Sequence, residues 1–172
     1  MNPAPRAARS LTLTMLLALS VSAAAATEGA PGARSEAAAA AVERAQRQLA
    51  QRPRDATARF ALGVALAEAG RDADAMAIYR GLIEDHPELP EPYNNLAVLQ
   101  ARAGDTDAAR ASLEAAVRAR PDHAIAQENL GDIYVTLAAR AWQRASAADP
   151  TRSGAAAKLA LVRELRSKAA AP

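Results

Sequence analysis

The sequence predicts an all-α fold, a short stack of antiparallel helical hairpins with a single helix covering each end. Pro53, Pro87 and Pro121 lie 34 residues apart, and each follows an Ala-rich run with a charged face. A fixed period of this length indicates a repeat architecture. Aromatic residues make up 3% of the 172-residue chain. That composition disfavours a β-sandwich, because sheets are built from β-branched and aromatic side chains.

The first 26 residues have the three-part layout of a secretory signal peptide. Arg6 and Arg9 supply the positive start, and an apolar core follows them. Small residues at Ala24 and Ala26 then fit a signal-peptidase site. We therefore expect export to the periplasm, with cleavage near Ala26 and a flexible linker over residues 27–34. An uncleaved N-terminal anchor is the alternative, although the apolar core is short for a membrane span.

Charge and cysteine content exclude several kinds of partner and site. The formal net charge is +2, from 21 basic and 19 acidic residues, and residues 1–26 hold Arg6 and Arg9 but no acid. Removing these two arginines leaves 19 basic against 19 acidic residues. A balanced chain gives no electrostatic reason to expect nucleic acid, and we expect no stable membrane insertion after cleavage. With no Cys, the fold depends on packing alone.

The first expected helix, over residues 35–53, stands where the second helix of a hairpin would stand. Pro53 ends it in the same phase as Pro87 and Pro121. Ser35 is a suitable N-cap, because its hydroxyl can accept from a free amide of the first turn. The first helix of this unit is missing from the sequence, so we expect the segment to be a partial repeat that covers the end of the stack.

Two complete units follow, and their small and bulky residues recur at the same offsets. Pro87 and Pro121 end the second helix of each unit, because proline removes a donor and restricts the residue before it. Residues 56–89 have Leu62-Gly63, Gly70, Ala75, Tyr79 and Pro87 at these offsets, and residues 90–123 have Tyr93, Leu96-Ala97, Gly104, Ala109, Leu113 and Pro121.

These residues and spacings resemble the tetratricopeptide repeat (TPR) family, whose pattern is an aromatic residue, Leu-Gly, Tyr, Ala, an aromatic residue and Pro. The chain departs from the pattern at Arg59, Leu66 and Gln100. The resemblance implies a right-handed α-α superhelix formed by a single domain over residues 35–168. It implies very little about a particular activity.

The positions at which these residues recur predict how the helices pack. Small residues on the first helix of each unit should face small residues on the second, so that the backbones approach closely. Gly70 and Gly104 should adopt positive φ in the turns, each followed by a capping carboxylate from Asp72 or Asp105. The expected contacts pair Gly63, Ala97 and Gly131 with Ala75, Ala109 and Ala138, and Tyr79, Leu113 and Trp142 should fill the interior.

The third unit, residues 124–150, is shortened. Pro150 comes 29 residues after Pro121, and the segment between Tyr134 and Ala138 has no turn-forming residue. An apolar stripe continues at helical spacing across the join. We therefore predict one long helix over about residues 125–147, with a third hairpin closed by a very tight turn as the alternative. Residues 151–168 should form a C-terminal cap helix that folds back on the long helix.

No motif for catalysis or for a cofactor is present. The sequence lacks a glycine-rich phosphate loop, the paired-histidine zinc motif and a nucleophile elbow. His86 and His123 lie at unit ends, where a solvated turn position explains them better than a metal site does. We expect no enzyme activity, no cofactor and no metal.

The resemblance instead points to the concave groove, which the first helix of each TPR unit lines. Asn side chains there could bond the backbone of an extended peptide, or they could bond a neighbouring helix. Apolar side chains could hold those of a ligand. By phase, the groove positions are Thr57, Phe60, Val64, Glu68, Glu91, Asn94, Val98, Arg102, Ile125, Glu128 and Asp132, with Asn95 and Asn129 beside them.

The function that these features favour is a non-enzymatic protein-interaction module or scaffold of the cell envelope. Its partner would be a protein or peptide bound in the groove. A self-associating structural protein and a membrane-tethered accessory subunit are the alternatives, since the exposed ends of a short repeat array can stack.

Overall fold

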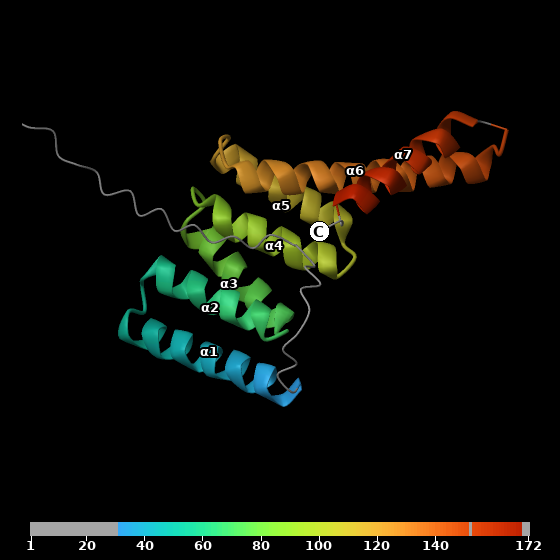
Figure 1. Cartoon of the computed structure of the whole chain (residues 1–172). Coiled ribbons are helices and arrows are strands. Elements are labelled where there is room, and N and C mark those ends of the chain that lie inside the picture. The colour runs from blue at the N-terminus through green and yellow to red at the C-terminus, as the bar shows by residue number, and fades with distance from the viewer. Residues whose placement is uncertain (1–30, 152, 170–172) are drawn as a thin grey trace, which may run out of the picture.

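The computed structural model describes residues 31–151 and 153–169 as seven α-helices, and no strand occurs in these residues. The chain is therefore all-α over the part described, as predicted (Figure 1). The helices are α1 (Pro31–Gln51), α2 (Ala56–Glu68), α3 (Asp72–Asp85), α4 (Pro90–Arg102), α5 (Thr106–Ala119), α6 (Ala124–Ala148) and α7 (Ser153–Ala169).

The N-terminal helix starts earlier than the sequence predicts. α1 begins at Pro31, so residues 31–34 of the expected linker are helical and Ser35 lies inside the helix. Proline is well tolerated in a first helical turn, because its missing N–H would have no intrahelical partner there and its fixed φ suits the helix. The expected signal peptide and residues 27–30 lie outside the described residues.

The two glycine turns adopt the predicted backbone conformation. Gly70 and Gly104 have φ values of 73° and 84°. Asp105 caps α5 by accepting from the Ala108 amide at 3.0 Å. The expected cap by Asp72 is wrong: Arg71 is the N-cap of α3 and makes no side-chain cap bond. Asp72 is the first residue of α3, where its negative charge interacts favourably with the positive end of the helix dipole.

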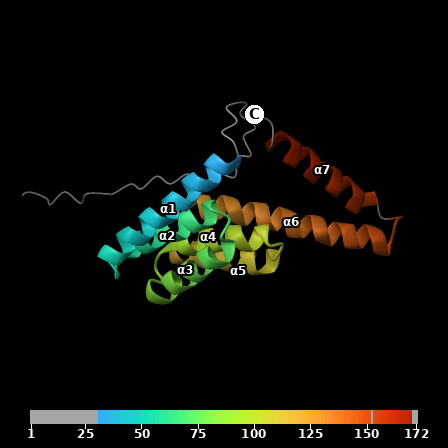
Figure 2. The ribbon, with the colours of Figure 1, turned by 90° about the horizontal axis from the view of Figure 1, so that it is seen from below.

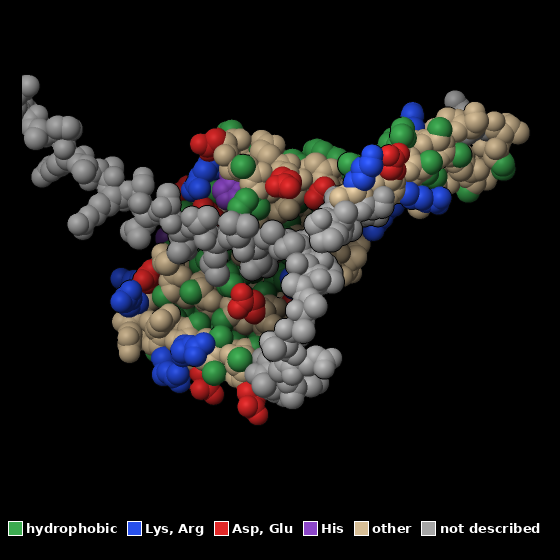
Figure 3. All heavy atoms as spheres, viewed as in Figure 1, with side chains coloured by type: hydrophobic (Ala, Val, Ile, Leu, Met, Phe, Trp, Pro, Cys, Tyr) green, Lys and Arg blue, Asp and Glu red, His purple; other side chains and the backbone are tan. Residues whose placement is uncertain are grey.

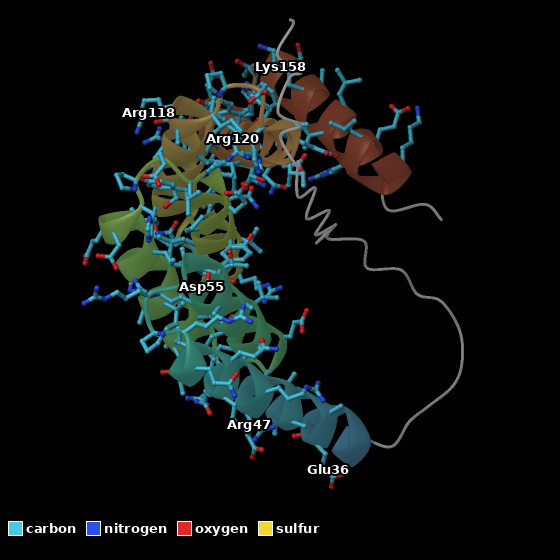
Figure 4. The ribbon with its side chains drawn as sticks, turned by 90° about the vertical axis from the view of Figure 1, so that its left-hand side faces the viewer. Glu36, Arg47, Asp55, Arg118, Arg120 and Lys158 are labelled. Atoms are coloured by element: carbon cyan, nitrogen blue, oxygen red, sulfur yellow. The ribbon has the colours of Figure 1, made fainter. Side chains whose placement is uncertain are left out.

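The helices form a curved stack. Figure 4 shows an arc in which α2 and α4 lie on the inner side and α3 on the outer side, with Glu36 near one end and Lys158 at the other. Figure 2, seen from below, shows that α7 diverges from the long α6 toward the inner side. No helix in the described part of the chain combines the length and the apolar character that a membrane crossing needs.

Among the described residues, two hydrophobic clusters hold the stack together. The first joins α1, α2, α3 and α4, and Tyr79 and Leu82, at 1% and 0% exposed, lie at its centre. The second joins α4, α5 and α6 around Ala97 and Leu113. The second cluster contains the expected pair, Ala97 and Ala109. In the first unit, the atoms nearest to Gly63 belong to Tyr79 and Ile78 and not to the expected Ala75. A Cβ built on Gly63 would lie 2.6 Å from Cε1 of Tyr79.

The predicted long helix is confirmed, because α6 runs without a break from Ala124 to Ala148. α7 folds back and packs against it. The expected contact between Gly131 and Ala138 is wrong, since both residues belong to this one helix and a Cβ on Gly131 would meet nothing within 4 Å. The loss of the turn removed the hairpin that would have brought them together.

Trp142 does not take the interior place that Tyr79 and Leu113 occupy. Its side chain is half-buried, and the Nζ atom of Lys158 on α7 lies 5.6 Å from its ring centroid. This distance suits a cation–π contact. Because α6 projects beyond the stack, its second half meets α7 instead of a following repeat.

Candidate binding surface on the inner side of the arc

The positions that the sequence assigns to the groove all lie on α2, α4 and α6, together with Asn95 and Asn129. We call this set the inner face. Val64 and Asn94 are buried, at 5% and 7% exposed, and so offer little surface to a ligand. Phe60, Glu91, Asn95, Val98 and Asn129 are half-buried, and Thr57, Glu68, Arg102, Ile125, Glu128 and Asp132 are exposed.

Three asparagines and one tyrosine form a continuous chain of hydrogen bonds across three helices. The Asn129 amide on α6 donates to Oδ1 of Asn94 on α4 at 2.8 Å. Asn94 donates to Oδ1 of Asn95 at 3.3 Å, and Asn95 donates to the Tyr79 hydroxyl on α3 at 3.3 Å. A satisfied polar network of this kind fixes one packing arrangement. We call it the amide relay.

The amide relay uses side-chain groups that a bound peptide would otherwise engage. The sequence left two roles open for Asn95 and Asn129, a bond to peptide backbone or a bond to a neighbouring helix. In the structure both make bonds to neighbouring helices. Each amide NH₂ has a second hydrogen, so Asn95 and Asn129, which are half-buried, retain a donor.

The relay ends on a tyrosine that is held inside the first cluster. The Phe60 and Tyr79 rings lie 5.7 Å apart at an interplanar angle of 48°, a tilted geometry that aromatic pairs favour. Burial raises the pKa of the Tyr79 hydroxyl above its usual 10.0. The hydrogen bond from Asn95 lowers that pKa, and the charge of Glu68 raises it.

Stability at alkaline pH should report this buried hydroxyl. Native Tyr79 keeps its proton to a higher pH than the unfolded chain does, so its contribution is complete below about pH 10 and is lost as the pH rises further. The free energy of unfolding, measured with urea at about pH 9 and about pH 11, should fall more in the wild type than in Tyr79→Phe. Equal losses in the two proteins would contradict the buried hydroxyl.

Some charged side chains of the inner face lie close to an opposite charge, and others do not. Arg102 on α4 lies 3.7 Å from Asp72 on α3, and Glu91 lies 2.9 Å from Arg120, the C-cap residue of α5. Glu68, Glu128 and Asp132 form no ion pair with another described residue. The charge left available to a ligand is therefore acidic. Figure 3 shows acidic side chains on α6 and basic side chains on α7 in this view.

A hollow of 520 Å³ adjoins the inner face and was not anticipated from the sequence. It lies between α1 and the C-terminal end of α2, and Val42, Gln46, Glu68 and Arg71 are among its lining residues. The available signal was the partial first unit. Within the described residues no helix precedes α1, and the end of α2 is left partly uncovered.

The two histidines lie in turns. His123 accepts a hydrogen bond at Nδ1 from the Ala126 amide at 3.1 Å and so caps α6. His86 is the C-cap residue of α3, with Nδ1 3.6 Å from Glu88. Over the residues that the structure describes, no group of three or more His, Cys, Asp or Glu side chains could hold a metal ion.

Comparison with known proteins agrees with the repeat geometry. The tetratricopeptide repeat family model matches residues 32–90 and 94–152, which is more than half of the chain. This protein belongs to the tetratricopeptide repeat family. Proteins of this family generally act as protein-interaction modules and scaffolds. Membership therefore supports a role in protein–protein interaction for this TPR protein. A search of curated proteins finds no match.

Solved structures of other TPR proteins are similar to this one. The crystal structure of YrrB, described as a TPR protein with an unusual peptide-binding site, aligns at 27% identity with a TM-score of 0.51. The alignment covers 54% of this chain and 48% of YrrB, so the chain matches about half of that protein. Two crystal structures of MamA align at 18% and 17% identity, with TM-scores of 0.53 and 0.54. They cover 77% and 83% of this chain, and 75% and 87% of theirs.

Proposed function

We propose that this TPR protein is a non-enzymatic interaction module that binds a Lys- or Arg-bearing segment of a protein on its inner face. The observation that supports this most directly is the acidic charge of Glu68, Glu128 and Asp132, which are exposed and form no ion pair with another described residue. The one inner-face cation, Arg102, already lies near Asp72. The similar structure of YrrB, described as having an unusual peptide-binding site, supports a peptide as the kind of ligand.

Apolar contact would supply most of the affinity, and charge would select the partner. Phe60 and Val98 are half-buried, and Ile125 is 39% exposed, so the inner face offers apolar surface beside the carboxylates. Charge complementarity governs association rate and partner choice more than it governs affinity. We therefore expect binding to weaken as salt rises, since exposed charges are screened.

A synthetic peptide of alternating Lys and Leu, followed by fluorescence anisotropy, tests the proposal. Glu128→Gln combined with Asp132→Asn should weaken its binding about tenfold, equivalent to about 1.4 kcal/mol. Glu36→Gln combined with Glu84→Gln removes two exposed charges elsewhere, on α1 and α3, and should leave the affinity unchanged. Equally tight binding of a Glu/Leu peptide, or no effect of the inner-face pair, would refute the proposal.

We also propose that the protein acts in the periplasm after export. The support is the signal-like pattern of residues 1–26 in the sequence. The intact mass of protein recovered from the periplasm of an expressing Gram-negative cell should correspond to a chain starting near Thr27. A mass that includes residues 1–26, in protein that stays with the membrane fraction, would favour the tethered accessory subunit.

A further inference from the structure

The exposed large apolar side chains among the described residues all belong to the last two helices. They are Ile125 and Tyr134 on α6 and Leu161 and Leu165 on α7. The two leucines are 65% and 55% exposed. Their spacing of four residues places them on the same side of α7, whereas Leu159 and Val162 are partly buried. We call Leu161 and Leu165 the leucine stripe.

The helix that carries the leucine stripe is basic. The sequence of α7 contains Lys158, Arg163, Arg166 and Lys168 against the single acid Glu164. Lys168 lies 2.7 Å from Glu164, and Lys158 lies over Trp142. A basic helix with an apolar stripe is suited to dock on an acidic surface with apolar patches.

We propose that α7 of one copy docks on the inner face of a second copy, so that the chain associates head to tail. This inference rests on the proposed function, because it assigns the same inner face to a particular ligand. Charge complementarity selects this occupant: α7 has four basic residues and one acid, and the inner face has four acids and one Arg. In the docked state the leucine stripe would contact apolar side chains of the inner face such as Val98, which lies on its central helix α4.

The alternative pairings fit the observations less well. A symmetric contact between two α7 helices would bring like charges together, which is destabilising. Contact with the chain's own inner face does not cover the leucine stripe, since both leucines remain exposed. A heterologous contact of this kind produces a ring or an open chain, because each copy presents one helix and one receiving face.

A charge-swap experiment tests the docking. In the helix variant, Lys158, Arg163 and Lys168 are all replaced by Glu. In the face variant, Glu68, Glu128 and Asp132 are all replaced by Lys. Sedimentation velocity at rising protein concentration should show association of the wild type and monomers of each variant alone. An equimolar mixture of the two variants should associate again, since the acidic helix then meets the basic face.

The outcomes separate this inference from the proposed function. Circular dichroism verifies that both variants are folded. A wild type that stays monomeric at all concentrations, or a mixture that fails to associate, would overturn the docking. Monomeric protein that binds vesicles of anionic lipid through α7 would overturn it as well. In each case, tight binding of the Lys/Leu peptide to the inner face would leave the proposed function standing.

Discussion

Replacing Gly63 with alanine should lower the free energy of unfolding by about 1–3 kcal/mol, the usual cost of overpacking a well-filled interior. The new Cβ would lie 2.6 Å from Cε1 and 3.1 Å from Cζ of Tyr79, and 3.2 Å from Cγ2 of Ile78. The Tyr79 ring is 1% exposed and has no free space into which to move. The clash therefore has to separate α2 from α3.

The second unit shows how the clash can be relieved. At the equivalent places it has Ala97 and Leu113, which are both buried. Adding Gly63→Ala to a Tyr79→Leu background should therefore cost much less than adding it to the wild type. Urea denaturation of the four proteins in this cycle measures the coupling. Independent, additive effects at the two positions would show that the ring contact is not the cause.

The matched control is Gly131→Ala. This glycine also lies in a helix, but a Cβ there would meet nothing within 4 Å. Alanine should raise the free energy of unfolding by about 0.5–1 kcal/mol, because glycine is a poor helix former. Opposite signs for the same substitution at two helical glycines would separate close packing from helix propensity.

Replacing Asn94 with alanine should destabilise the fold by about 1–3 kcal/mol, because it removes two side-chain hydrogen bonds, each with a net contribution of about 0.5–1.5 kcal/mol. Asn94 is 7% exposed and holds the middle of the amide relay. Without the Asn94 side chain, the amide of Asn129 on α6 loses the oxygen to which it donates, and Oδ1 of Asn95 loses the amide from which it accepts. The contact between the second and third units should loosen most.

Asn129→Ala provides the second side of a double-mutant cycle. If the 2.8 Å bond between Asn129 and Asn94 contributes as expected, the double variant should be less destabilised than the sum of the two single variants. Urea denaturation followed by circular dichroism gives all four free energies. A Lys/Leu peptide that binds Asn94→Ala as tightly as the wild type would indicate that this side chain acts in packing and not in recognition.

Much of the fold could be predicted from the sequence because local patterns specify it. The proline period gave the two complete units, and Gly70 and Gly104 occupy turns whose positive φ favours glycine. The missing turn chemistry before Ala138 predicted the unbroken α6. The helix start at Pro31 was missed because both Pro31 and Ser35 are acceptable first-turn or capping residues, and local sequence alone does not choose between them.

The sequence predicted where the candidate site lies, but not which of its side chains are exposed or already paired. Helical phase identified the set of groove residues, but their exposure depends on contacts between helices. Asn94 is phased like Phe60 and Arg102, yet it lies buried against Asn129 from the next unit. Arg102 is also a groove position by phase, yet it lies near Asp72 on α3, the helix before its own.

The sequence by itself determined the helical content, the repeat length, the turn positions and the place where the array ends. These follow from periodicity, from proline and glycine, and from the absence of a turn, which act within a few residues of one another. Only the tertiary structure decided which inner-face groups are free. The reason is that burial and hydrogen bonding on the inner face depend on contacts between different helices, as in the amide relay. These contacts leave Glu68, Glu128 and Asp132 exposed beside apolar surface.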